Sequence, residues 1–319
     1  MNVDLTDPIF NDEEAARKHF EARRWPDGPV CPHCGVVGEA TEMQGKTTRP
    51  GLYNCRACDK PFSATIGTIF ERSHIPMHTW LLAVYLMAAS KKGISAQQLF
   101  RTLGFGSYRT AWFMAHRIRE SMRELGMPPL GGTGKTAEAD EAFVGGRETN
   151  KHKKVRSKQH TGGFGGKEAV FSIVERGGKV RSHHVPSVSA KTLRPILEAQ
   201  LDKNSVLMTD GEGQYRLLGP MYADHKVVNH RIGEYVRGDA HTNTVESYFA
   251  TLKRGINGTY HHVSQQHLKR YLCEFDFRHN ERAALKVSDP ERAERILRGS
   301  VGKRVTYQET NGKGSKAAD

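Results

Sequence analysis

The chain has 319 residues and carries 48 lysines and arginines against 35 aspartates and glutamates, a formal net charge of +13. This length is enough for two or three domains, and the positive excess favours nucleic acid over a membrane surface as partner, because no long basic amphipathic segment is visible. A secreted or membrane-spanning protein is disfavoured, since the N-terminal stretch lacks an apolar signal core and the longest apolar run, residues 80–89, is far too short to span a bilayer. We therefore expect a cytoplasmic protein, and a basic protein without a polyanionic partner is the alternative.

Two CxxC pairs follow the N-terminal segment, residues 1–28, in which residues 12–24 are expected to form a short amphipathic helix. Twenty residues separate the pairs, which is close to the spacing of a zinc ribbon, where four thiolates bind one Zn²⁺. A redox dithiol is the competing interpretation of the first pair, CPHC, but no βαβ pattern surrounds it and a second pair is present as partner. We expect a zinc ribbon over residues 29–70, with Cys31, Cys34, Cys55 and Cys58 as the zinc ligands.

The next region, residues 71–128, has the pattern of an all-α segment. A helix is expected from Pro76 to Gly93, a second begins after Ser95, and a third begins after Ser107. Two helices joined by a short glycine-containing turn, the second rich in arginine, are typical of a helix-turn-helix, although plain helical hairpins share the pattern. On the second of these helices, Arg109, Arg117 and Arg119 are the expected DNA contacts.

Beyond a Pro/Gly-rich linker, residues 127–135, the pattern changes to strands and helices in the order βββαβαβα. This order predicts a ribonuclease-H-like arrangement, a mixed five-stranded sheet with helices on both faces, over residues 129–285. The last segment, residues 286–319, is an extension whose end, residues 309–319, is expected to be disordered. The expected strands are 136–144, 168–175, 179–188, 205–209 and 226–229. The expected helices are 189–201, a helix or turn after Asp210, 241–254 and one more containing Leu268, Tyr271, Leu272 and Phe275.

A basic segment rich in glycine lies between the first two of these strands. Such a loop could follow a phosphate backbone, or it could be no more than a solvated insertion. The candidate DNA contacts in it are Lys151, Lys153, Lys154 and Arg156.

The helix expected at residues 241–254 has two different faces. Its apolar residues recur at helical spacing, which predicts burial of one face. Glu246 and Lys253 are seven residues apart, almost two full turns, so they project from nearly the same side, with Asn243 one turn before Glu246. A carboxylate, an amide and an ammonium on one open face suit a metal ion beside a phosphate, although a surface helix with solvated charges is the plainer alternative. The apolar residues are Val245, Phe249, Leu252 and Ile256.

Two aspartates favour the metal hypothesis. Asp140 lies in the first expected strand, and Asp210 directly follows the apolar run SVLMT at the end of another. Acids there are costly unless something binds them, and strand ends are where α/β sheets place ligands. With Glu246 they could converge on two Mg²⁺ ions about 4 Å apart, the arrangement that promotes phosphoryl transfer.

These motifs together resemble a known family. CPHCG…CRAC, ADEAFVGG, TDGEGQY and NTVESYFATLKRGINGTYHHVS, which cover nearly the whole chain, resemble bacterial insertion-sequence transposases of the DDE class with a zinc ribbon, a helix-turn-helix and a ribonuclease-H-like core. The resemblance implies that Asp140 and Asp210 are the first two catalytic acids and that Lys253 is the basic residue seven beyond the third. The third position is open between Glu246 and Asn243. We favour Glu246, because a carboxylate binds a second Mg²⁺ better than a neutral amide.

The resemblance also implies an activity. Such a protein would bind the terminal inverted repeats of its element, cleave a phosphodiester with Mg²⁺ or Mn²⁺ to free a 3′-OH, and join that end to target DNA. It would work as a homo-oligomer on double-stranded DNA in the bacterial nucleoid, with Lys253 and Arg254 close to the DNA. A catalytically silent DNA-binding regulator and a structure-specific nuclease on the same fold are the alternatives.

Overall fold

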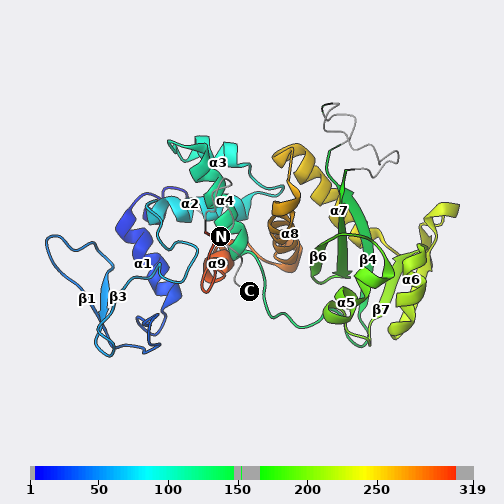
Figure 1. The fold of residues 1–319 in the computed structure, drawn as a ribbon, viewed down its shortest axis with the longest axis horizontal. Helices are drawn as coiled ribbons and strands as arrows, with labels where there is room; N and C mark the ends of the chain where they lie inside the picture. The colour runs from blue at the N-terminus through cyan, green and yellow to red at the C-terminus, as the bar shows by residue number, and fades with distance from the viewer. Residues whose placement is uncertain (1–3, 147–151, 153–165, 307–319) are drawn as a thin grey trace. The chain divides into compact units, whose positions relative to one another are not determined.

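The computed structural model describes residues 4–146, 152 and 166–306, and it divides into two compact units (Figure 1). The N-terminal unit is built from the chain up to residue 89, from residues 96–122 and from residue 288 onward. The core unit is built from residues 90–95 and 123–287. The finer domain limits given above stay a prediction.

The N-terminal unit begins with one helix and a small antiparallel sheet in the order β1-β2-β3. The Asp12 carboxylate accepts a hydrogen bond from the N–H of Ala15 at 2.6 Å, which caps α1 and explains why the predicted helix begins there. Trp25 and Tyr53 pack edge to face against each other, and both contact Phe62 of β3. The elements are η1 (Pro8–Phe10), α1 (Glu13–Arg24), β1 (Ala40–Glu42), β2 (Tyr53–Cys55) and β3 (Pro61–Phe62).

Four further helices complete this unit, three of them as predicted. Ser107 occupies the N-cap position of α4, although its side chain makes no capping hydrogen bond. The fourth helix, α9, was not predicted, and it begins with a capping box in which Ser288 and Glu291 bond each other's backbone N–H groups. The S-x-x-E spacing around Pro290 was the sequence signal that could have found it. The helices are α2 (Met77–Ala89), α3 (Ala96–Thr102), α4 (Tyr108–Ser121) and α9 (Asp289–Arg298).

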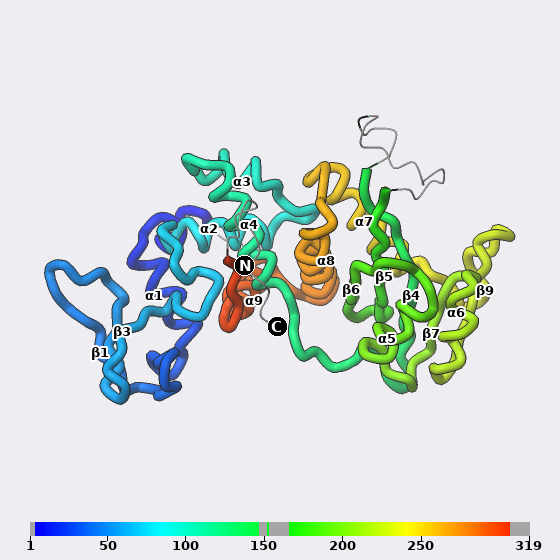
Figure 2. The backbone as a smooth tube through the Cα atoms, viewed as in Figure 1, coloured from blue at the N-terminus to red at the C-terminus, as the bar shows by residue number. Residues whose placement is uncertain are grey.

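The core unit contains the predicted mixed sheet, with five strands in the order β6-β5-β4-β7-β8. In Figure 2 the labels of β6, β5, β4 and β7 follow one another in this order from left to right. β5 pairs antiparallel with both β4 and β6, whereas β7 pairs parallel with both β4 and β8. The order of elements, βββαβαβα, and the ribonuclease-H-like arrangement are therefore confirmed. The strands are β4 (Thr136–Val144), β5 (Glu168–Glu175), β6 (Val180–Val185), β7 (Val206–Asp210) and β8 (Asp224–Val228).

Helices cover both faces of this sheet. Successive residues of β4 point to opposite faces, and the apolar ones belong to two different clusters. Ala137 and Ala139 pack with residues of α5 and α6, whereas Ala142 and Val144 pack with residues of α7 and α8. The apolar residues predicted for the last two helices are all buried. The helices are α5 (Ala190–Gln200), α6 (Gly213–Leu218), α7 (Asn243–Gly255) and α8 (Gln265–Asn280), with a short hairpin of β9 (Val236–Arg237) and β10 (Ala240–His241) before α7. Short turns of helix are η4 (Gly219–Met221), η5 (His230–Ile232), the π-helical η6 (Ile256–Tyr260) and η7 (Ala283–Leu285).

The predicted linker, residues 127–135, is partly built into this core. Leu130 is buried in the α5/α6 cluster, and its backbone forms a parallel bridge with Leu201. The tail, residues 309–319, lies outside the described residues. Along the described ranges, no helix combines the length and apolar character that crossing a membrane requires.

Candidate active site and zinc site

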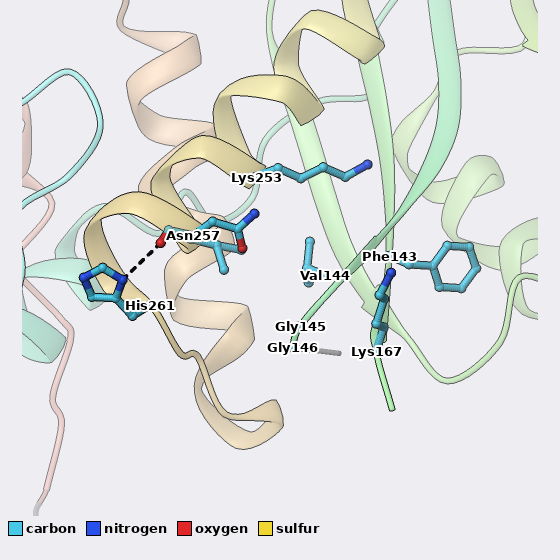
Figure 3. Close-up of a pocket in the computed structure, with 9 residues that line it drawn as sticks. Phe143, Val144, Gly145, Gly146, Lys167, Lys253, Asn257 and His261 are labelled. Carbon is cyan, nitrogen blue, oxygen red and sulfur yellow. Dashed lines mark hydrogen bonds between the residues drawn. The ribbon is translucent and has the colours of Figure 1, made fainter. Parts of the chain in front are cut away.

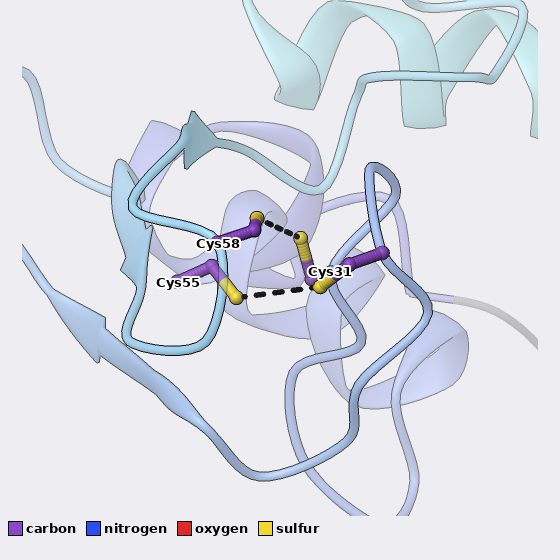
Figure 4. A group of neighbouring side chains, drawn as sticks. Cys31, Cys55 and Cys58 are labelled. Atoms are coloured by element: carbon purple, nitrogen blue, oxygen red, sulfur yellow. Dashed lines mark hydrogen bonds between the residues drawn. The ribbon is translucent and has the colours of Figure 1, made fainter.

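The four predicted zinc ligands come together in the N-terminal unit (Figure 4). The sulfurs of Cys31 and Cys58 are 3.7 Å apart, those of Cys34 and Cys55 are 3.6 Å apart, and all four lie within 4.8 Å of one another. These distances exceed a disulfide bond, and all four cysteines are free. A tetrahedral zinc with Zn–S bonds of about 2.3 Å holds its sulfurs about 3.8 Å apart. The arrangement fits Zn²⁺, because the second CxxC pair closes the cluster around the first, as a four-thiolate zinc site requires and a single redox pair does not.

The backbone and the electrostatics of this cluster support the same assignment. Gly35 has φ of +78°, the left-handed conformation that closes the first CxxC turn. Burial raises the pKa of Cys31, but the backbone N–H groups of His33 and Cys34 and the neighbouring thiols lower it to about 6. Burial and the same thiols raise the pKa of Cys58 to about 12. Thiols this close cannot all ionise unless a cation compensates them, which is what Zn²⁺ does.

Zinc is expected to be needed for the fold of the ribbon. Native mass spectrometry of purified protein should find one Zn²⁺ per chain, and chelation should unfold the ribbon, because the binding free energy of a structural zinc is folding free energy. Cys55→Ser should lose the metal, whereas Cys273→Ser on α8 should keep it. Freshly purified protein that contains no zinc would contradict the assignment of a zinc ribbon.

The first two predicted acids lie side by side on two neighbouring inner strands of the core sheet, β4 and β7. β4 and β7 are parallel neighbours whose last paired residues are Glu138 and Met208. Two residues further along both strands, the same register brings Asp140 next to Asp210, on the same face of the sheet. The Asp140 carboxylate accepts a hydrogen bond from the N–H of Glu141 at 2.7 Å.

The charges around these acids show that a third carboxylate is close. The pKa of Asp140 is raised to about 8, first by burial and also by the negative charges of Glu141, Asp210 and Glu246, whereas the hydrogen bond from the Glu141 N–H lowers it. Burial also raises the pKa of Asp210, against the lowering effect of His230. Asp140 is therefore electrostatically coupled to both of the other predicted acids.

Glu246 lies in the first turn of α7, close enough to Asp140 for their charges to interact. Its Oε1 accepts a hydrogen bond from Thr242 Oγ1 at 2.8 Å and lies 3.6 Å from Nε2 of His230. The side chain is 44 % exposed, so a ligand can reach it. Asn243, the alternative third residue, is the exposed first residue of α7.

Sequence reasoning missed His230 and Glu141. His230 lies near both Asp210 and Glu246, but nothing in the sequence before η5 indicates that position. Glu141 belongs to the ADEAFVGG motif, and its carboxylate accepts hydrogen bonds from Gln214 and the Tyr215 hydroxyl of α6. Burial raises its pKa to about 7.

A pocket of about 510 Å³ opens beside the ends of β4 and α7 (Figure 3). Lys253 of α7 and Lys167, just before β5, both line it, together with Gly145 and Gly146. Two ammonium groups around a glycine-walled opening suit a phosphate group. The remaining lining residues are Phe143, Val144, Ile256, Asn257 and His261.

The acids suit a divalent cation, although they are less tightly gathered than the cysteines. Among the described residues, only the cysteine set brings three or more ligand atoms all within 4.8 Å of one another. The oxygen donors of Asp140, Asp210 and Glu246 are the type that Mg²⁺ prefers, and their mutual repulsion is what a cation would relieve. The donor set fits Mg²⁺ or Mn²⁺ and not a soft metal.

The predicted DNA contacts fall into three groups. Arg109 at the start of α4 is exposed, as is Arg254 on α7. Arg117 and Arg119 are only 6 % and 1 % exposed, and Arg117 donates to the carbonyl oxygen of Glu71 at 2.6 Å with its guanidinium over the Trp80 ring. The inner side of α4 therefore packs into the unit, and a DNA contact of these two arginines stays a prediction. Lys151, Lys153, Lys154 and Arg156 lie outside the described residues.

Comparison with known proteins agrees with this geometry. Residues 129–280 match the family model of the ISXO2-like transposase domain, and residues 11–61 match that of the transposase zinc-ribbon domain. The chain is also 30 % identical over 282 residues to a Halobacterium salinarum protein described as an uncharacterized protein in transposable element ISH50, covering 84 % of this chain and 91 % of that protein. The zinc-ribbon family and its four cysteines imply Zn²⁺, and the DDE domain implies a divalent metal such as Mg²⁺. This chain therefore belongs to the IS1595 family of insertion-sequence transposases, which combine a zinc ribbon with an ISXO2-like DDE domain.

Proposed function

We propose that this transposase binds the terminal inverted repeats of its element, hydrolyses a phosphodiester at each end, and joins the freed 3′ end to target DNA. In the joining step the 3′-hydroxyl oxygen attacks a target phosphodiester, and the 3′-oxygen of the target strand leaves. The observation that supports this most is that Asp140 and Asp210 lie on neighbouring parallel strands, on the face of the sheet that is covered by α7, the helix of Glu246. Three carboxylates from two strands and a helix, beside a lysine-lined pocket, suit phosphoryl transfer better than any other chemistry of this unit.

The three acids have one role in this proposal and the lysines another. Asp140, Asp210 and Glu246 would hold two divalent cations, which when bound would stabilise the charge that develops on the phosphate oxygens. Lys253 and Lys167 would bind the phosphodiester next to the one that reacts, and thereby orient the cleaved end. Asn243, one turn before Glu246, would contact the cation's water or the phosphate without adding charge.

We propose that α3 and α4 form a helix-turn-helix that recognises the terminal repeats of the element. In that motif the N-terminal residues of the second helix contact bases, and α4 begins with Tyr108, 46 % exposed, and exposed Arg109. The basic segment between β4 and β5 would follow the DNA backbone, as would Arg254 of α7. Both ends of an element must be processed together, so we propose a homo-oligomer on nucleoid DNA.

Arg109→Ala is expected to weaken binding to a terminal-repeat duplex without changing thermal stability. Loss of one base-contacting arginine costs about 1–3 kcal/mol of discrimination, or about 5- to 150-fold in affinity. Arg117→Ala should instead lower the melting temperature, because it removes a buried guanidinium that bonds the Glu71 carbonyl. Fluorescence anisotropy and thermal melting would separate the two effects. The control is Lys18→Ala on α1, which should bind like wild type; equal loss with Arg109→Ala and Lys18→Ala would place recognition elsewhere.

The proposed activity can be tested with the DNA that flanks the gene. Matched inverted repeats there would supply a labelled duplex, which the protein should cleave at the repeat boundary only with Mg²⁺ or Mn²⁺. A nuclease would cut duplexes lacking the repeat equally well, and a silent regulator would bind the repeat without cutting it. Either result would contradict the proposal.

A further inference from the structure

One buried carboxylate near the predicted acids has no assigned role. Glu138 is fully buried in β4, two residues before Asp140. Alternate residues of a strand face the same side of a sheet, so both side chains face α7. Burying a carboxylate is costly unless it is fully paired, so its partners indicate what it does.

One carboxylate oxygen of Glu138, Oε2, binds the first turn of α7. Oε2 of Glu138 accepts hydrogen bonds from the N–H of Thr244 at 2.7 Å and from the N–H of Val245 at 3.0 Å. These N–H groups belong to the first turn of the helix, where backbone donors have no partner within the helix and a negative charge is favourable. A strand residue thus caps the helix that carries Glu246.

The other oxygen, Oε1, binds Thr244 and Arg176, and Arg176 in turn binds the chain that leads into α7. Oε1 of Glu138 accepts from Thr244 Oγ1 at 2.9 Å and from Nε of Arg176 at 2.6 Å. The same guanidinium donates to the carbonyl oxygens of Asp239 and His241, both at 2.9 Å. All of these bonds connect the sheet to the segment directly before Glu246.

From these contacts we propose that Glu138 is a positioning residue, which fixes α7 against β4 at the separation at which Glu246 and Asp140 can hold one divalent cation. Both carboxylate oxygens are already occupied by donors from α7 and Arg176, so Glu138 is not itself a metal ligand. The inference rests on the proposed function, because it assumes that those two acids bind the metal. A displacement of about 1 Å in such a constellation can cost about 100-fold in rate.

Glu138→Gln tests the proposal, since an amide keeps the size but presents an N–H₂ group to helix N–H donors. Binding of Mn²⁺ can be followed by the electron paramagnetic resonance signal of the free ion, without DNA. Glu138→Gln is expected to weaken it by about 10- to 100-fold, the usual effect of losing a group that orients a metal ligand. Cleavage of the terminal-repeat duplex should need correspondingly more metal and should recover at saturating metal.

The matched control is Asp276→Asn on α8. Asp276 is another acid within the core, and it accepts from the N–H of Ser182 at 2.8 Å and from Tyr248 Oη of α7 at 2.6 Å, away from the start of that helix. Asp276→Asn should lower the melting temperature and leave Mn²⁺ binding unchanged. Thr244→Val is a milder second variant that removes only the Thr244 Oγ1 bond, and it should weaken Mn²⁺ binding in the same direction by a smaller factor.

Two results would overturn the positioning role. One is wild-type Mn²⁺ affinity in Glu138→Gln, or in Thr244→Val should the first variant not fold. The other is an equal loss of affinity in Asp276→Asn, which would make the effect one of stability. The proposed function fails in a different way: Glu246→Gln would then bind Mn²⁺ like wild type.

Discussion

Glu246→Gln is expected to reduce cleavage of a terminal-repeat duplex by about 100- to 1,000-fold, the range lost when one electrostatic stabiliser of a transition state is removed. Two Mg²⁺ ions bring four positive charges, of which Asp140 and Asp210 offset only half, so the third carboxylate matters. Glutamine keeps the size of the side chain and its bond to Thr242 Oγ1. Binding to the repeat should therefore survive, and a gel-based assay of both activities would check this.

Asn243→Ala is the comparison that decides the third position. Its amide is neutral and lies at the exposed first residue of α7, so its loss should reduce cleavage less than Glu246→Gln does. If instead Glu246→Gln cleaves like wild type and Asn243→Ala is inactive, the asparagine is the third residue and the assignment of Glu246 is wrong.

Asp140→Asn is expected to abolish cleavage and to make the metal-free protein more stable. The Asp140 carboxylate lies among the negative charges of Glu141, Asp210 and Glu246, so an isosteric amide removes repulsion. The stabilisation of wild type by Mn²⁺ should disappear at the same time. At about 100 times its dissociation constant, Mn²⁺ adds about 2.7 kcal/mol, or about 5–10 °C in melting temperature for a domain of this size.

Calorimetry with and without Mn²⁺ would check both effects. Asp276→Asn is the control, because its hydrogen bonds to Ser182 and Tyr248 stabilise the fold and the acid is not one of the proposed metal ligands. It should melt at a lower temperature and still respond to Mn²⁺. A metal response in Asp140→Asn equal to that of wild type would exclude this acid as a ligand.

The sequence predicted the elements well where the pattern was periodic. The ends of β4 and β5 agree with the prediction, because alternation and turn glycines mark them clearly. The stripe from Val245 to Ile256 is buried as predicted, since helical spacing is a direct consequence of geometry. The cysteine cluster followed from spacing alone, because four thiolates have few other uses.

Burial of charged residues was harder to predict. Arg117 and Arg119 stand among apolar residues of α4, and arginine is normally an exposed residue, so a basic helix suggested a DNA-binding face. In the structure Arg117 stacks on Trp80 and Phe113, and its charge is turned inward. Tertiary packing alone makes Arg117 and Arg119 buried and leaves Arg109 exposed.

The supporting contacts of the site were also beyond sequence reasoning. Glu138 lies in the same strand as Asp140, but its partners are Arg176, more than thirty residues away, and Thr244, more than a hundred residues away. His230 likewise reaches Glu246 only through the fold of the segment after β8. Such pairings depend on which strands become neighbours, and periodicity within one segment does not report that.

Strand transfer is the reaction that a transposase performs and that neither a nuclease nor a silent regulator would perform. A labelled terminal-repeat duplex with a free 3′-OH would be incubated with the protein, supercoiled plasmid and Mg²⁺, and joined products would be separated by size. Wild-type protein is expected to attach the label covalently to plasmid, and no attached label is expected with chelator or with Glu246→Gln. Cleavage of the duplex without joined product under any metal condition, or joining by Glu246→Gln at the wild-type rate, would contradict it.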